Sequence, residues 1–236
     1  MKEVYDTYLE SHFLSLNSTT KRAFEHMVKA YAMWYKKFLP SNRDARILDI
    51  GCGMGHFLYF LKCEGYRNFL GIDISKQQID FVKENITDSA AVADALDFLG
   101  KEHFEVIVLN DILEHIPKNK LIEFLHMVSD SLENSGVVFI KVPNMSNPFG
   151  LKSRYITITH EVGFTEYSLL EVLKTIGFQD ILITPAYSPV LSAKSLLGRT
   201  GQAIIHRFLK LLFLMQGYRV PKIMTANIIA IAKKAK

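Results

Sequence analysis

The segment Asp49-Ile50-Gly51-Cys52-Gly53-Met54-Gly55-His56 lies between an apolar run, residues 46–50, and a stretch with helical character, residues 54–63. Its three glycines stand at alternate positions. Glycine has no Cβ, so this backbone can turn sharply and can approach a ligand closely. In open α/β sheets, ligands lie beyond the carboxyl ends of the strands. The segment therefore predicts a strand, a ligand-binding loop and a helix, in that order.

Apolar runs and amphipathic stretches alternate along the rest of the chain. The expected strands are 46–50, 69–72, 90–93, 104–109, 137–142, 178–184 and 223–232. The expected helices are 54–63, 76–84 with Ser75 as N-cap, 117–132, 166–176 between Thr165 and Gly177, and 190–218 with a break near 198–201. This alternation predicts an α/β fold whose mostly parallel sheet carries helices on both faces.

The length of 236 residues and the 49% apolar content favour one large domain over two separate cores. Residues 1–40 are rich in aromatics, and apolar residues recur at helical spacing between 23 and 38. We expect an N-terminal helical cap over 1–40 and an α/β domain over 41–236, with a helical insertion at 186–222. Tyr5, Tyr8 and His12 would form a lid over a ligand, or the whole region would serve packing.

Charge and cysteine content restrict the partners and the compartment. The net charge of +4 is too small to indicate a nucleic-acid-binding protein, and two cysteines give no disulfide framework. No signal-peptide core and no membrane-spanning run occurs, so we expect a cytoplasmic protein. Residues 203–215 mix apolar and basic side chains. Three roles stay open for this segment: contact with the inner membrane face, a homodimer contact, or a helix that covers the sheet. The protein is accordingly expected to be a monomer or a homodimer.

The acid before the glycine loop helps to choose between ligands. A dinucleotide fold would continue the pattern G-x-G-x-x-G or A, but its sixth position here is His56. The negative charge of Asp49 would also repel the pyrophosphate of a dinucleotide. A carboxylate suits a cation, and S-adenosylmethionine carries a sulfonium and an ammonium group. The charge pattern therefore favours S-adenosylmethionine over NAD.

Polar residues follow three further strands of the predicted sheet. Asp73, which precedes Ile74, is placed to accept both ribose hydroxyls, or it caps the next helix. Asp94, beside Ala95, is placed to accept the adenine amino group, or it forms a turn. Asn110 follows the fourth strand and is expected to contact the cofactor.

Taken together, residues 47–55, 71–75, 94–95 and 113–117 resemble the class I S-adenosylmethionine-dependent methyltransferases, in the order of that family and over roughly residues 40–185. The resemblance implies a Rossmann-like sheet of seven strands, with 223–232 as an antiparallel seventh strand beside the fifth. It implies that Asp49 and the loop residues Gly51, Cys52, Gly53 and Gly55 hold the methionyl part. It also implies that Asp73 binds ribose and Asp94 binds adenine.

Residues 147–155 and 159–165 are similar to methyltransferases associated with bacterial surface-polysaccharide biosynthesis. That similarity implies a sugar hydroxyl, or a phosphate at a glycan end, as the methyl acceptor. Its residues suggest His160 as the catalytic base, because histidine exchanges protons near neutral pH. The alternative for His160 is that it orders this loop by bonding to the backbone. Arg154 and Tyr155, with Tyr8, are the expected substrate-binding residues, and the alternative for Arg154 and Tyr155 is a solvated loop.

His115 is a second candidate for proton transfer, or it anchors its loop through the ring nitrogens. The residue pattern assigns no metal ligands. Three functions stay open: O-methylation of a sugar or glycan, O-methylation of a small lipophilic acceptor such as a quinone precursor or fatty-acid derivative, and an inactive protein that binds the cofactor as a partner. A nucleic-acid methyltransferase is not favoured, because no Asn-Pro-Pro-Tyr or Asp-Pro-Pro-Tyr follows the fourth strand.

Overall fold

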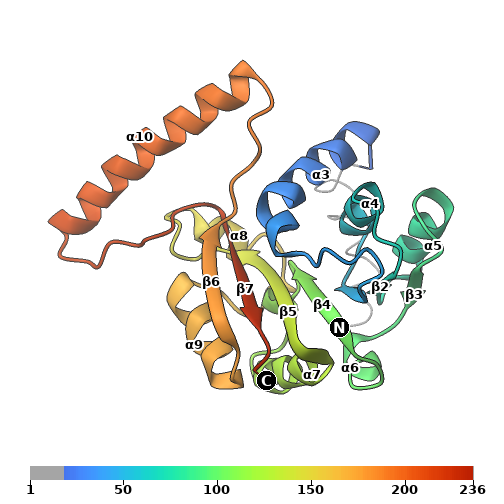
Figure 1. Ribbon diagram of the computed structural model, residues 1–236. Helices are drawn as coiled ribbons and strands as arrows, with labels where there is room; N and C mark the ends of the chain where they lie inside the picture. The colour runs from blue at the N-terminus through green and yellow to red at the C-terminus, as the bar shows by residue number, and fades with distance from the viewer. Residues whose placement is uncertain (1–18, 236) are drawn as a thin grey trace.

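A computed structural model of the chain describes residues 19–235. These residues form one seven-stranded sheet in the order β3-β2-β1-β4-β5-β7-β6 (Figure 1). The strands are β1 (Ile47–Ile50), β2 (Phe69–Asp73), β3 (Ala90–Val92), β4 (Phe104–Asn110), β5 (Leu132–Pro143), β6 (Gln179–Pro185) and β7 (Asn227–Lys233). Strands β1 to β5 pair in parallel, and β7 pairs antiparallel with β5 and β6. The predicted fold class and the place of the last strand are confirmed.

The helices lie on both faces of this sheet. They are α3 (Lys21–Tyr35), α4 (His56–Cys63), α5 (Lys76–Asn85), α6 (Ala95–Phe98), α7 (Leu121–Asp130), α8 (Gly150–Arg154), α9 (Glu166–Ile176) and α10 (Ala193–Met215), with short 3₁₀ turns η2 (Lys36–Phe38) and η3 (Leu113–His115). Helix α10 projects away from the sheet (Figure 1). It is the predicted helical insertion before the last strand.

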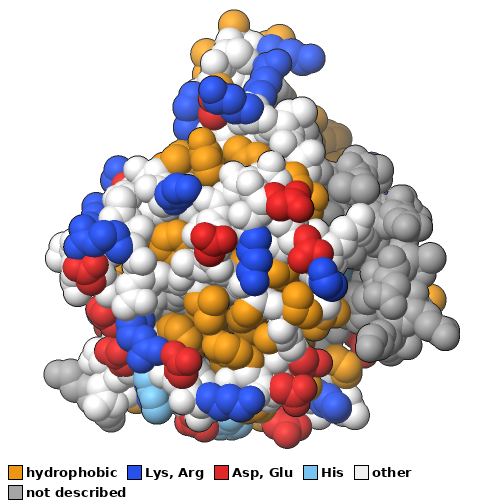
Figure 2. All heavy atoms as spheres, turned by 90° about the vertical axis from the view of Figure 1, so that its right-hand side faces the viewer, with side chains coloured by type: hydrophobic (Ala, Val, Ile, Leu, Met, Phe, Trp, Pro, Cys, Tyr) orange, Lys and Arg blue, Asp and Glu red, His pale blue; other side chains and the backbone are white. Residues whose placement is uncertain are grey.

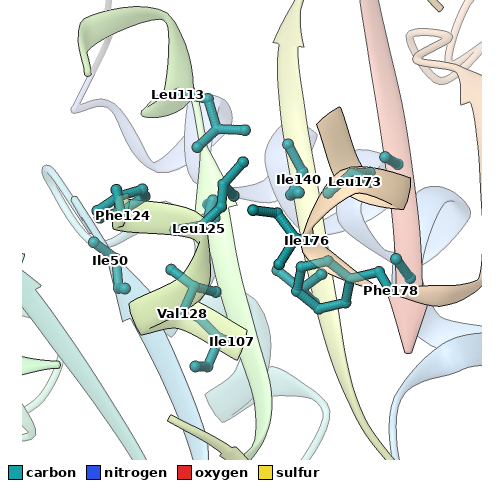
Figure 3. Close-up of a cluster of buried hydrophobic side chains, with 14 of the residues drawn as sticks. Ile50, Ile107, Leu113, Phe124, Leu125, Val128, Ile140, Leu173, Ile176 and Phe178 are labelled. Carbon is teal, nitrogen blue, oxygen red and sulfur yellow. The ribbon is translucent and has the colours of Figure 1, made fainter. Parts of the chain in front are cut away.

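The alternation of side chains along each strand separates two apolar layers. Ile50 and Ile107 lie against α7 (Figure 3), and Leu48 belongs to the same apolar cluster, which also includes residues of α9. Ile47 and Val106, one residue away in each strand, face α3 and α4. All five side chains are buried. Burial of one such side chain stabilises the fold by roughly 1.5–3 kcal/mol, so both faces of the central strands hold the helices in place.

Local capping chemistry was predicted correctly. Ser75 caps α5 by accepting a hydrogen bond from the Gln78 amide. Thr165 and Ser168 form a reciprocal capping box at the start of α9, which ends at Gly177 in the left-handed conformation.

Three element boundaries were predicted wrongly. Helix α7 covers only Leu121–Asp130, not 117–132, because Leu132 already pairs with Phe104 at the start of β5. Helix α10 runs without the expected break through Gly198 and Gly201. A glycine costs a helix only about 1 kcal/mol, which does not end it. The last strand begins at Asn227 and not at 223, because its pairing with β5 starts with Asn227 opposite Pro143.

The N-terminal region packs against the sheet through α3. Tyr35 is fully buried and stacks on Phe139 of β5 at 4.8 Å between ring centroids. Tyr31 meets Phe57 of α4 edge to face. Tyr5, Tyr8 and His12 lie outside the described residues, so the lid remains a prediction, as does a domain boundary at residue 40. Among residues 19–235, no helix combines the length and the apolar character needed to cross a bilayer.

Candidate active site

The glycine loop turns at the carboxyl end of β1. Gly51, Gly53 and Gly55 all have positive φ, between +55° and +77°. The amides of Gly51 and Cys52 both donate to the Ile72 carbonyl, at 2.8 and 3.0 Å. A Cβ on Gly51 would come within 2.0 Å of the Ile112 side chain. The loop thus needs glycine both for its conformation and for its close packing on the neighbouring strand ends.

Asp73 holds this loop to the end of β2. Its Oδ2 accepts a hydrogen bond from the Gly53 amide at 3.0 Å, and its Oδ1 accepts one from the Ser75 amide at 2.9 Å. Burial raises the pKa of Asp73, while these backbone hydrogen bonds act to lower it. A carboxylate has about four acceptor positions, so two remain for the hydroxyls of a ligand.

Asp49 lies beneath the same loop and is 2% exposed. Burial raises its pKa well above the usual value, and the neighbouring charge of Asp73 raises it further. A nearby cation stabilises the ionised form of a buried carboxylate, because their attraction offsets the cost of desolvation. The position therefore suits a positively charged ligand group.

The adenine side of the predicted site is partly open. Ile74 is 49% exposed next to Asp73 and offers an apolar contact surface. Asp94 caps α6, because its Oδ1 accepts from the Leu96 amide at 2.9 Å, and its other oxygen is not used there. Ala95 is the first residue of that helix. Cys52 is buried with its Sγ toward Gly71, so only its backbone is placed to meet a cofactor.

Asn110 ends β4 and connects the site to the N-terminal helix. Its Oδ1 accepts a hydrogen bond from the Tyr35 hydroxyl at 2.8 Å. Its Nδ2 is buried and has no hydrogen-bond partner among residues 19–235. The next residue, Asp111, has φ +58° and forms an ion pair with Lys141 at 2.5 Å. The Nδ2 group of Asn110 is thus available to donate to an acceptor on a ligand.

Two histidines from distant parts of the sequence meet beside these residues. The rings of His115 and His160 lie edge to face with centroids 4.6 Å apart. Nδ1 of His160 lies 2.7 Å from the Ser153 carbonyl, which only a protonated Nδ1 can bond, so Nε2 carries the lone pair. Burial lowers the pKa of His115 to about 4 and also lowers the pKa of His160. Both imidazoles are therefore neutral at pH 7.

Arg154 and Tyr155 differ in their freedom to contact a substrate. The guanidinium of Arg154 donates to the carbonyls of His160 and Glu161, and so orders this loop. Tyr155 is 75% exposed. Tyr8 lies outside the described residues. The substrate-binding role of all three stays a prediction.

The residues present fit S-adenosylmethionine. Asp49 is a buried carboxylate that suits a cationic group, Asp73 keeps acceptor positions for two hydroxyls, and the unpaired amide nitrogen of Asn110 needs an acceptor such as a carboxylate. Tyr35 and Glu114 had no predicted role. The one sequence feature that pointed to Glu114 is its place beside His115, and Tyr35 was one aromatic among many.

Comparisons with known proteins agree with this architecture. An uncharacterised protein of Rickettsia prowazekii is 31% identical over 111 residues, which are 43% of this chain and 44% of that protein. A tRNA U34 carboxymethyltransferase of Desulfotalea psychrophila is 29% identical over 125 residues, 49% of this chain and 38% of the relative. This chain spans less than half the length of these curated relatives.

The crystal structure of a SAM-dependent methyltransferase from Archaeoglobus fulgidus has a TM-score of 0.67 at 23% identity, over 94% of this chain and 98% of the other. That likeness shows a shared fold. A family model described as a methyltransferase domain matches residues 23–183. Since this match covers more than half of the sequence, the chain belongs to the methyltransferase domain family.

Proposed function

We propose that this methyltransferase moves the methyl group of S-adenosylmethionine to a hydroxyl of a sugar or glycan, in the assembly of a cell-surface polysaccharide. Methyl transfer follows from the family. The choice of a hydroxyl acceptor rests on one observation, the oriented lone pair of His160 Nε2 beside the carboxyl edge of the sheet.

The residues of the site divide the work of this reaction. S-adenosylmethionine supplies a methyl group already activated on a sulfonium centre. The glycine loop, Asp49 and Asp73 hold and orient that group, which is the main requirement for an in-line displacement. As a free imidazole, His160 accepts the proton of the attacking hydroxyl at Nε2. Ser153 keeps the ring in the tautomer that this task needs.

A methyl-transfer screen tests the proposal. Nucleotide sugars, lipid-linked glycans and quinone precursors are offered with labelled S-adenosylmethionine. His160→Ala is expected to lower kcat by roughly 100-fold or more while the affinity for S-adenosylmethionine, measured by calorimetry, stays the same. His126→Ala, an exposed histidine on α7, is the control. Full activity of His160→Ala would remove the role of His160, and no methylation of any saccharide would contradict the acceptor.

A small lipophilic acceptor is a second candidate, favoured by the segment around α8. Phe149, Leu151 and Ile158 are 69%, 69% and 86% exposed there. Apolar side chains in water next to a site suit an apolar substrate. In the same screen this function predicts methylation of quinone precursors or fatty-acid derivatives and none of the sugars.

We also propose that α10 binds the surface of the inner membrane, where lipid-linked substrates lie. No side chain of α10 is buried, and its sequence contains no Asp or Glu. Its exposed apolar residues are Leu196, Leu197, Ile204, Ile205, Phe208, Leu211, Leu212, Leu214 and Met215. In the second half of α10, His206, Arg207 and Lys210, together with Lys222 beyond the end of the helix, line a hollow of about 270 Å³. Apolar and basic groups together favour an anionic lipid surface.

A further inference from the structure

Glu114, His115 and His160 form a compact group of metal-ligating side chains. One ligand atom from each residue lies within 4.8 Å of the other two. His115 follows Glu114 in the turn η3 after β4, whereas His160 comes from the loop between α8 and α9. Only the tertiary structure brings the third residue to the first two.

The backbone holds the two segments together. The Glu114 carbonyl accepts hydrogen bonds from the amides of Glu161 and Val162, at 2.7 and 3.2 Å. The guanidinium of Arg154 binds the His160 and Glu161 carbonyls from the other side. The distance between the two histidines is therefore set by backbone contacts.

His160 already has the outer hydrogen bond of a metal-bound histidine. Its Nδ1 donates to the Ser153 carbonyl at 2.7 Å and leaves Nε2 as the donor atom for a metal. Histidine ligands in proteins almost always donate their second ring N–H to a carbonyl, a carboxylate or water. Because burial lowers the pKa of both histidines, both are neutral, as ligands must be.

Glu114 provides a second observation that points to a ligand. The residue is 2% exposed, and its Oε2 is buried without a hydrogen-bond partner among the described residues. Its pKa is raised well above the usual value, first by burial and then by the charge of Asp111, while Lys141 acts to lower it. Lys141 is itself ion-paired with Asp111. A bound cation would stabilise the ionised form of Glu114 and satisfy its oxygen.

We propose that Glu114, His115 and His160 bind one divalent transition-metal ion. Two imidazoles and one carboxylate are ligands that Zn²⁺, Fe²⁺, Mn²⁺ and Co²⁺ all accept, with further positions open to water or substrate. Ligand bonds of about 2.0–2.2 Å place ligand atoms about 3–3.5 Å apart. Because the present ligand atoms lie up to 4.8 Å apart, metal binding requires the three side chains to draw together by up to about 1–2 Å.

The ion would change the chemistry of the proposed function, and this consequence rests on that function. A hydroxyl on a divalent ion loses its proton more readily than a free one. His160 would then act as a ligand and no longer as the proton acceptor; the ion would lower the pKa of the bound acceptor hydroxyl, whose proton would pass to solvent water. The binding site itself does not depend on the identity of the acceptor.

A cobalt titration of the full chain tests the site. After treatment with a chelator and dialysis, Co²⁺ is added and its visible d–d absorption is followed. We expect one ion per chain, displaced by Zn²⁺. Glu114→Gln and His160→Ala are each expected to weaken Co²⁺ binding by roughly 100-fold or more, beyond the loss caused by removal of an outer hydrogen bond. His126→Ala and His103→Ala, two exposed histidines away from the group, should bind as the wild type does.

Two readouts separate loss of the site from loss of the fold. Circular dichroism and calorimetry with S-adenosylmethionine are run on each variant, and Glu114→Gln preserves the side-chain volume if His160→Ala does not fold. No cobalt band at millimolar Co²⁺, or a band of unchanged strength in both variants, would overturn the proposal. Because neither readout uses a methyl acceptor, failure of the metal site and failure of the proposed acceptor are observed separately.

Discussion

At the scale of single residues, the site depends on carboxylates that have structural as well as binding roles. Asp73 joins the amides of Gly53 and Ser75, and so holds the glycine loop and the start of α5 at one point. This contact was not foreseen, since the sequence offered only a ribose ligand or a helix cap. The same oxygens can serve both purposes because each has two acceptor positions.

Replacement of Asp73 tests its binding role. In Asp73→Asn one acceptor oxygen becomes a donor, so the variant loses at least one strong hydrogen bond to a ligand hydroxyl. We expect the affinity for S-adenosylmethionine to fall by roughly 10- to 100-fold, about 1.5–3 kcal/mol. Isothermal titration calorimetry measures this, with the exposed Asp130→Asn as control. An affinity equal to that of the wild type would show that Asp73 does not contact the cofactor.

The buried carboxylate of Asp49 is expected to lower the free energy of unfolding of the cofactor-free protein, although it favours binding of a cationic cofactor. Its raised pKa means that the native protein holds the proton more tightly than the unfolded chain does. The free energy of unfolding therefore falls as pH rises from about 4 through the raised native pKa. Without cofactor, Asp49→Asn should be more stable than the wild type at pH 7, by roughly 1 kcal/mol or more.

Urea denaturation at several pH values checks this expectation. In Asp49→Asn the free energy of unfolding should depend less steeply on pH. Part of the dependence should remain, because Asp73 and Glu114 also have raised pKa values. The same variant should bind S-adenosylmethionine more weakly. If Asp49→Asn is less stable than the wild type at pH 7, the carboxylate has a stabilising partner and the argument from burial is wrong.

At the scale of elements, the glycine loop combines a conformational and a packing requirement that can be measured apart. Gly55, the N-cap of α4, has φ +77°, and an added Cβ would lie 2.8 Å from the Ile86 side chain. Gly65, just after the same helix, has φ +83° and open space around it. Gly55 and Gly65 therefore have similar backbone conformations and differ mainly in how closely other side chains pack around them.

Alanine at each position measures the two costs. Gly65→Ala should cost about 1–2 kcal/mol, the strain of a left-handed residue with a Cβ. Gly55→Ala should cost about 1–3 kcal/mol more, because Ile86 and Val82 must move. Free energies of unfolding from chemical denaturation give both values. Equal losses would show that the loop relaxes and that packing around Gly55 is not tight.

The accuracy of the sequence-based predictions also depends on the element. Caps at Ser75 and Thr165 follow from side-chain chemistry within three residues, and they were predicted. The early start of β5 at Leu132 was missed because it depends on pairing with Phe104, which is distant in the sequence. The expected break in α10 was wrong because each of Gly198 and Gly201 costs the helix only about 1 kcal/mol, which does not end it.

At the scale of the whole molecule, α10 is the feature that the core does not explain. In Figure 2, apolar and basic side chains lie together on the part that projects at the top, where Figure 1 places α10. An exposed helix of this composition requires a surface or a partner. A membrane surface and a second copy of the chain make different predictions.

Vesicle flotation distinguishes them. The wild type should float with vesicles that contain anionic phospholipid. Arg207→Ala combined with Lys210→Ala should weaken this binding by about 2 kcal/mol, roughly 30-fold, since each basic residue contributes about 1 kcal/mol. Lys83→Ala with Lys174→Ala, exposed elsewhere, is the control. No flotation, together with concentration-dependent dimers in sedimentation, would assign α10 to a homodimer contact.

The amino-acid sequence by itself determined the order of strands and helices, the glycine loop and the acids that follow each strand. These features are local, because they depend on the period of apolar residues and on backbone freedom at single positions. Tertiary structure alone decided that His160 meets Glu114 and His115, that Tyr35 binds Asn110, and that no side chain of α10 is buried. Such contacts join segments far apart in the chain, and their geometry depends on how two loops and two layers of helices pack on one sheet.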